Sequence, residues 1–266
     1  MSGDEVFVTV LSLVVGPVAW AVWVFRAAGV QRLRGRQPRL GVILAVVSAC
    51  AVVLLAVLRT IAAPDVRDDP AYLVMYFVLG LAWLRVAEFC FAYAGVSVRD
   101  DVLERGNTAA LLAASGALVG VTLCYAGGNI GSGPGWWVVV FSAGLATAGL
   151  AAVWLVVDRA ANMSDLVTIE RDPAAGLRLG SLLAACGVIL GRAVAGDWHS
   201  VDATVVDFVR IGWAAAPLVV VAIGIERAAK PTVAEPRPSV ALAGVVPAVI
   251  YLIAAAVTVI VAGWPA

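Results

Sequence analysis

The chain has 266 residues, of which 62% are hydrophobic, with equal numbers of basic and acidic residues and a mean hydropathy of +0.99. A chain of this length has too little interior to hide so much apolar surface, so the composition excludes a water-soluble globular protein. Runs of about 18 or more apolar residues are long enough to cross a bilayer, and in lipid each run must satisfy its own backbone hydrogen bonds as a helix. The sequence therefore predicts an all-α polytopic membrane helix bundle.

Eight such runs follow one another along the chain, and we expect each to be a transmembrane helix. In chain order they cover residues 6–29, 40–62, 72–96, 107–127, 136–157, 174–195, 204–225 and 240–262. The linkers between them are short, so residues 1–266 are expected to form a single membrane domain. Within it, residues 72–200 are expected to be the core, and helix pairs at 1–70 and 204–266 are expected to flank it.

Positive charges fall on alternate linkers, and this pattern indicates the orientation of the helices. These linkers carry Arg32, Arg34, Arg36 and Arg39, then Arg99 and Arg105, then Arg159 and Arg171, and finally Arg227, Lys230 and Arg237. Because cytoplasmic loops are rich in Lys and Arg, we expect these linkers on the cytoplasmic side of the membrane. With an even number of helices, both termini then lie outside.

The motifs of common enzyme classes are missing from the sequence. It has no Walker loop, no Gly-x-Ser-x-Gly elbow and no His-Glu-x-x-His pair. One histidine, His199, and four cysteines without Cys-x-x-Cys spacing give no ligand set for zinc or haem. We therefore expect a protein that is not an enzyme and that needs no cofactor or metal.

Charged residues inside the predicted helices are informative, because each costs about 2.5–3.5 kcal/mol near the bilayer centre. Arg85 and Glu88 are three residues apart and share one helix face, and Asp207 and Arg210 repeat this spacing. Either these pairs line a polar pathway, together with Asn107, or they neutralise each other and fix helix packing. The arginines expected near helix ends, where snorkelling toward water lowers the cost, are Arg59, Arg178, Arg192 and Arg210.

A repeated motif lies across the centre of the chain. Residues 103–111 match residues 169–177 at an offset of 66, and both copies lead into a helix that runs outward. Asn107 and Asp172 are favourable residues at the start of a helix. The motif also holds two acidic residues, favoured near a helix N-terminus, and two basic residues, namely Glu104, Glu170, Arg105 and Arg171.

Small residues behind the motif permit close contact between helices. They form Gly-x-x-x-Gly spacings at 116–120, 176–180 and 187–191. Such spacings allow a homo-oligomer without requiring one.

At these residues the sequence resembles the YjfL-like bacterial inner-membrane proteins. The resemblance is carried by Glu-Arg-Gly-Asn-Thr-Ala-Ala at 104–110, by Ser115, Gly116 and Gly120, and by Glu-Arg-Asp-Pro-Ala-Ala-Gly at 170–176. It covers about residues 72–200, and it implies two tandem helix-pair repeats, a domain of unknown function and a place in the bacterial cytoplasmic membrane. The chain departs from the family at Asp172, where a second Asn is usual, and in its additional helix pair at each end.

Three functions stay open from the sequence. The preferred one is a non-enzymatic membrane scaffold or partner component, whose cytoplasmic loops 97–106 and 158–173 meet another protein. The second is a channel or transporter for a small ion or polyamine-like solute. The third is an intramembrane enzyme, which would need Glu88 beside a water-filled cavity. The lipid bilayer is an expected partner in every case, and no nucleic acid is expected.

Overall fold

The structure is a computed structural model that describes residues 1–34, 39–229 and 239–265, with the backbone alone described at 30–34. Every regular element in these ranges is helical, and no strand occurs in them. Seven of the described helices are long and apolar enough to cross a membrane, and a bent pair raises the number to eight if it forms one span. The predicted all-α class with multiple apolar helices is therefore confirmed, while the count of eight depends on the bent pair.

The first half of the chain builds three long helical segments and the first helix of the core. The elements are α1 (Gly3–Leu13), the π-helical turn η1 (Val14–Val18), α2 (Ala19–Arg34), α3 (Arg39–Thr60), the short α4 (Pro64–Asp68), α5 (Pro70–Cys90), the 3₁₀ turn η2 (Phe91–Ala94), the π-helical η3 (Val98–Glu104) and α6 (Thr108–Gly127). The second half holds α7 (Trp136–Ala161), α8 (Met163–Thr168), α9 (Pro173–Ala193), α10 (Val201–Gly212), α11 (Ala215–Ala228), the π-helical η4 (Val240–Val245) and α12 (Val246–Ala262).

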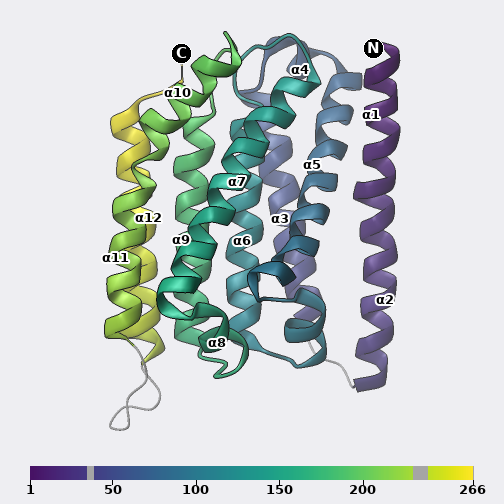
Figure 1. The fold of residues 1–266 in the computed structure, drawn as a ribbon. Coiled ribbons are helices and arrows are strands. Elements are labelled where there is room, and N and C mark those ends of the chain that lie inside the picture. Colours follow the sequence, from purple (N-terminus) through teal and green to yellow (C-terminus); the bar gives the residue numbers. More distant parts are fainter. Residues whose placement is uncertain (35–38, 230–238, 266) are drawn as a thin grey trace.

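The long helices run side by side, and both termini lie at the same end of the bundle (Figure 1). The opposite end, which we call the arginine-rich end, carries Arg39, Arg99, Arg105, Arg159, Arg171 and Arg227. Arg36, Lys230 and Arg237 lie outside the described residues, as do the side chains of Arg32 and Arg34. The linkers predicted to be cytoplasmic from their basic residues thus lie together at one end of the bundle.

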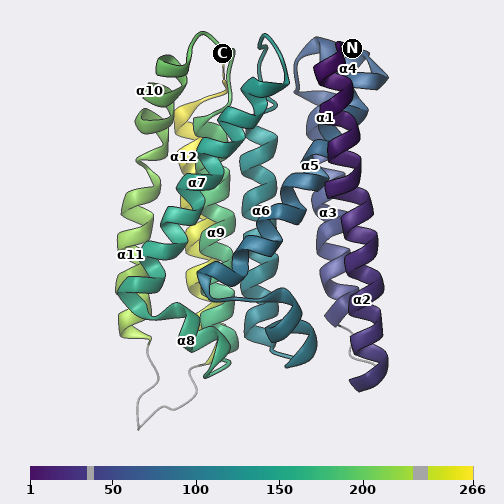
Figure 2. The same ribbon diagram turned by 45° about the vertical axis from the view of Figure 1, so that its right-hand side comes forward.

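The centre of the bundle is the parallel pair α6 and α9, which touch more extensively than any other two elements (Figure 2). Glycines let the two backbones meet directly. A Cβ atom on Gly116 would collide with the backbone of Gly180, and one on Gly127 would collide with that of Gly191. The predicted small-residue spacings therefore serve packing within the chain, so these surfaces are not free to join a second copy.

The remaining helices surround this pair. α3 packs on α5 and α6, α12 packs on α9, and α11 packs on α7 and α9, while α1 and η1 pack on α5. Trp20 lies at the start of α2, and its indole N–H donates to the carbonyl of Leu81 in α5 at 3.0 Å. The flanking helix pairs thus cover the core on both sides.

Three prolines mark the places where the outer helices deviate from regular α-helix. A proline has no N–H for the carbonyl four residues earlier and its ring crowds that carbonyl. Pro17 lies inside η1, and Pro247 is the second residue of α12, which begins where η4 ends. Pro217 lies in the first turn of α11, just after the break where α10 and α11 meet at a bend of 40°. The predicted helix 204–225 is therefore broken rather than continuous.

Candidate functional site

A groove of about 880 Å³ lies between the first span and α5. α1 and η1 contact α5 closely, and a Cβ on Gly16 would lie 2.8 Å from the backbone nitrogen of Ala82. Past this contact, α2 packs against η3. The groove runs past the Gly16 contact toward the arginine-rich end, with η1 and α2 on one side and α5, η2 and η3 on the other.

The lining of the groove is apolar along its length and charged toward the arginine-rich end. The apolar part includes Val14, Val18, Val22, Trp23, Phe89 and Tyr93. The charged part is formed by Arg26, Arg85, Glu88, Arg99 and Asp100. Apolar and charged surfaces in one groove fit a ligand that has both kinds of surface itself.

Arg85 and Glu88 form an ion pair in the wall of this groove, with Nη1 of Arg85 donating to a carboxylate oxygen of Glu88. The side chain of Glu88 is 5% exposed and that of Arg85 is 19% exposed. The Arg85 guanidinium also lies 5.7 Å from the centre of the Trp20 ring, a cation–π distance. Its Nε–H finds no acceptor among the described residues. The two charges neutralise each other, as one of the sequence-based alternatives predicts, and Arg85 keeps an unused donor.

The other residues of the predicted polar site lie elsewhere. Asp207 and Arg210 are exposed on α10, near the end of the bundle that holds the termini (Figure 1). Asn107 is buried at the start of α6, on the arginine-rich end. The five predicted residues therefore do not form one site, because the bend after α10 leaves its polar face at the surface and Asn107 is used as a helix cap.

Arg178 departs most from its prediction. It was expected to snorkel from a helix end, but the whole residue is 1% exposed and it lies in the packed interior. Its Nε and Nη2 donate to the two carboxylate oxygens of Glu226, both at 2.7 Å. Nη2 also lies 3.9 Å from Oδ2 of Asp172. A bidentate pair of this kind gives the guanidinium a fixed orientation.

The third nitrogen of this guanidinium explains how η4 is held. Nη1 of Arg178 donates to the carbonyl oxygen of Ala243. In a regular helix that carbonyl would accept the N–H of the residue at 247, which is a proline and has none. One arginine thus ties together α9, α11 and η4. Glu226 was not predicted from the sequence, because it falls one residue past the predicted helix 204–225. The proline at 247, inside an apolar helix, did signal a carbonyl without its usual N–H partner.

Both predicted helix starters act as N-caps. Oδ1 of Asn107 accepts from the backbone N–H groups of Ala109 and Ala110, at 2.9 and 3.3 Å. The Asp172 carboxylate accepts in the same way from the two backbone groups that follow Pro173, at 3.0 and 3.2 Å. Nδ2 of Asn107 also donates to the carbonyl of Val167 at 2.6 Å, which joins the start of α6 to α8.

The two junctions also match in backbone conformation. The residue before each cap has a positive φ, 67° at Gly106 and 57° at Arg171. Each cap residue donates its N–H to the carbonyl six residues earlier, at 2.9 Å for Asn107 and 3.0 Å for Asp172. The two caps are 65 positions apart. The offset of 66 aligns the flanking residues but not the caps, because it pairs Asn107 with Pro173.

The loops predicted to meet a partner fold onto the bundle. Residues 97–106 contain η3 and residues 158–173 contain α8. Each buries an apolar side, formed by Val98, Val102 and Leu103 in the first and by Met163, Leu166 and Val167 in the second. In the repeated motif, Glu104 pairs with Arg99 at 3.4 Å and Arg105 pairs with Asp101 at 2.9 Å. Glu170 and Arg171 are exposed.

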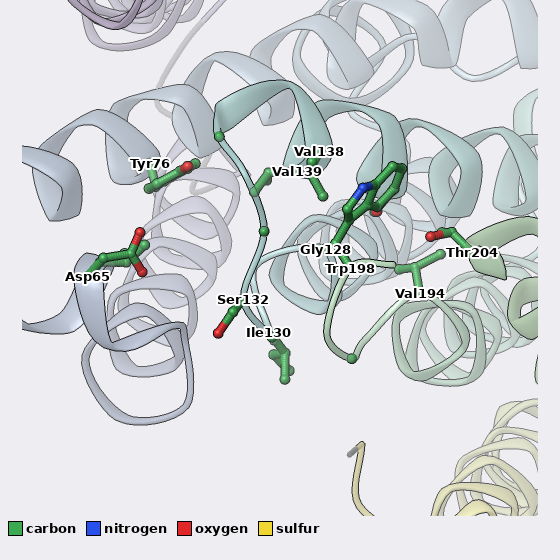
Figure 3. A pocket seen from close by; sticks show the side chains of 16 residues that line it. Asp65, Tyr76, Gly128, Ile130, Ser132, Val138, Val139, Val194, Trp198 and Thr204 are labelled. Atoms are coloured by element: carbon green, nitrogen blue, oxygen red, sulfur yellow. The ribbon is translucent and has the colours of Figure 1, made fainter. Parts of the chain in front are cut away.

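A small pocket of about 40 Å³ lies at the opposite end of the bundle, around the loop 128–135. Figure 3 shows Asp65 and Tyr76 on one side of this loop and Trp198 and Thr204 on the other. The pocket has room for a few water molecules. None of its lining residues lines the groove between α2 and α5, so these two cavities do not join.

Within the part of the chain that the structure describes, no three His, Cys, Asp or Glu side chains are grouped closely enough to hold a metal ion. In comparisons with known proteins, no family model, no curated protein and no solved structure matches the chain. The resemblance to the YjfL-like proteins therefore stays a prediction, carried by residues 104–110 and 170–176.

Proposed function

We propose that this chain is a non-enzymatic component of a bacterial cytoplasmic membrane, in which a static helical centre supports one binding groove that opens toward the cytoplasm. The observation that carries the proposal is the direct backbone contact between α6 and α9, which leaves the groove of about 880 Å³ off centre beside α5. A centre packed this closely is suited to holding helices in place. The bias of basic residues toward one end favours a cytoplasmic position for the groove mouth.

The same proposal includes a protein partner at the arginine-rich end. Its support is the exposed side of the two loops, where Arg99, Asp100 and Arg105 lie on one and Ile169, Glu170 and Arg171 on the other. Ile169 is 72% exposed, although the segment around it packs its other apolar side chains inward. An exposed isoleucine among charged residues is suited to a small contact with another protein.

A channel or transporter for a small ion or polyamine-like solute is the second candidate. It is favoured by the reach of the groove to the Arg85–Glu88 pair. Transport would require a second conformation, in which this groove connects with the pocket around the loop 128–135. The separate linings of the two cavities count against that route.

Liposomes that contain the purified chain should show no K⁺ or putrescine flux above that of empty liposomes, because the α6–α9 contact closes the centre. Ion-selective dyes and radiolabelled putrescine give the two readouts. Flux that Glu88→Ala or Arg85→Ala abolishes would overturn the proposal in favour of transport. Arg159→Gln is the matched control, since Arg159 is exposed at the same end and lies outside the groove lining.

A further inference from the structure

The groove between α2 and α5 is open to the side of the bundle as well as to its end. Its apolar lining residues are strongly exposed: Val14 is 55% exposed, Val18 53% and Phe89 61%. In a bilayer, these side chains face the hydrocarbon of neighbouring lipids. A lipid acyl chain can therefore enter the groove without crossing water.

The length of the groove corresponds to one leaflet. On the first span the lining runs from Val14 to Ala27, and the twelve residues from Val14 to Arg26 rise about 18 Å along a helix. One leaflet contributes about 15 Å of hydrocarbon. On the other wall, Arg85 lies five residues before the end of α5, a rise of about 7.5 Å. The charged residues are therefore placed within reach of a headgroup, and the valines lie deeper.

The charged end of the groove holds three arginines, and two of them have an acidic partner. Arg26 is exposed and forms no ion pair with any described residue. The Arg99 side chain is 66% exposed, but its Nε lies 3.4 Å from a carboxylate oxygen of Glu104. Glu88 is already neutralised by Arg85, which leaves Asp100 as the other acidic group in the lining. Arg26 is therefore the arginine of this end that is left to bind an anion, and arginine is well suited to phosphate oxygens.

From this lining we infer that the groove holds one anionic phospholipid of the leaflet at the arginine-rich end, with its phosphate at Arg26 and an acyl chain along Val22, Val18 and Val14. The inference deepens the proposed function, because it names the ligand of the same groove. A soluble phosphate compound would use Arg26 but would leave the apolar walls without a role. A zwitterionic lipid would fill the walls but would bring a positive group close to Arg26.

The test uses the full chain, purified in detergent and offered equal amounts of phosphatidylglycerol and phosphatidylcholine with identical acyl chains. Native mass spectrometry counts the lipid retained per protein. We expect preferential retention of one phosphatidylglycerol. Arg26→Gln should weaken it about fivefold, as expected for one arginine near an anionic lipid surface. Val18→Trp should reduce retention of either lipid, because the indole fills the apolar part of the groove.

Arg159→Gln is the control and should leave retention unchanged, since Arg159 is basic and exposed but is not part of the groove lining. Equal retention of the two lipids, or an equal loss in Arg26→Gln and Arg159→Gln, would overturn the lipid assignment. Displacement of phosphatidylglycerol by the same concentration of inorganic phosphate would also overturn it, in favour of a soluble anion. These results leave the flux measurement untouched, so failure of the lipid assignment is distinguishable from failure of the proposed function.

Discussion

Replacing Arg178 with methionine should lower the free energy of unfolding by about 3–5 kcal/mol, because it leaves the Glu226 carboxylate buried without its partner. Glu226 is 2% exposed and receives both of its hydrogen bonds from this one guanidinium. The change also removes the donor to the carbonyl of Ala243. The residue four positions later is Pro247, which has no N–H to replace that donor. Unfolding in mixed micelles of increasing sodium dodecyl sulfate, followed by circular dichroism, measures the loss.

The control for this variant is Arg210→Met, which makes the same chemical change at an exposed position of α10. It should alter the free energy of unfolding by no more than about 0.5 kcal/mol. The double variant Arg178→Met, Glu226→Leu should recover most of the loss, since no unpaired charge remains buried. Equal effects of Arg178→Met and Arg210→Met would contradict the structural role given to the pair.

Gly116→Ala should destabilise the chain by about 1–3 kcal/mol or more, since the added Cβ would collide with the backbone of Gly180. The neighbouring atoms belong to a helix backbone, which cannot move aside as a flexible side chain can. α6 and α9 would have to separate along their common contact. Gly116→Leu should have a larger effect, and the same mixed-micelle titration measures both.

The matched control is Gly224→Ala in α11, where an added Cβ would meet no atom within 4 Å. Alanine is the better helix former, so this change should stabilise the chain by about 0.5–1 kcal/mol. The two alanine variants are thus expected to shift stability in opposite directions. If both stabilise the chain, the close approach of α6 and α9 is wrong.

The sequence predicted well those features that depend on local physics. Apolar length located the helices, and residue type identified the caps at Asn107 and Asp172. The glycine spacings correctly indicated a close helix contact. A glycine has no side chain, so it allows a second helix to approach closely whichever helix that is. Neighbours three residues apart, Arg85 and Glu88, were likewise correctly paired.

Features that depend on distant parts of the chain were not predictable in the same way. Arg178 and Glu226 are 48 residues apart, and nothing in the local pattern joins them. Arg178 was instead expected to extend toward water, because it is close to the predicted end of a helix. The groove was also missed. It arises because α1 and η1 touch α5 whereas α2 packs on η3, and hydropathy does not show which elements a helix contacts.

The orientation of the bundle is tested most directly by thiol labelling at its two ends. Asp100→Cys, at the groove mouth, and Asp68→Cys, at the other end, both replace exposed residues. The background is Cys90→Ala, since Cys90 is exposed and the other three cysteines are buried. With a membrane-impermeant maleimide, we expect the thiol at 100 to react only in inverted vesicles and the thiol at 68 only in intact cells. Labelling at 100 in intact cells would contradict a groove that opens toward the cytoplasm.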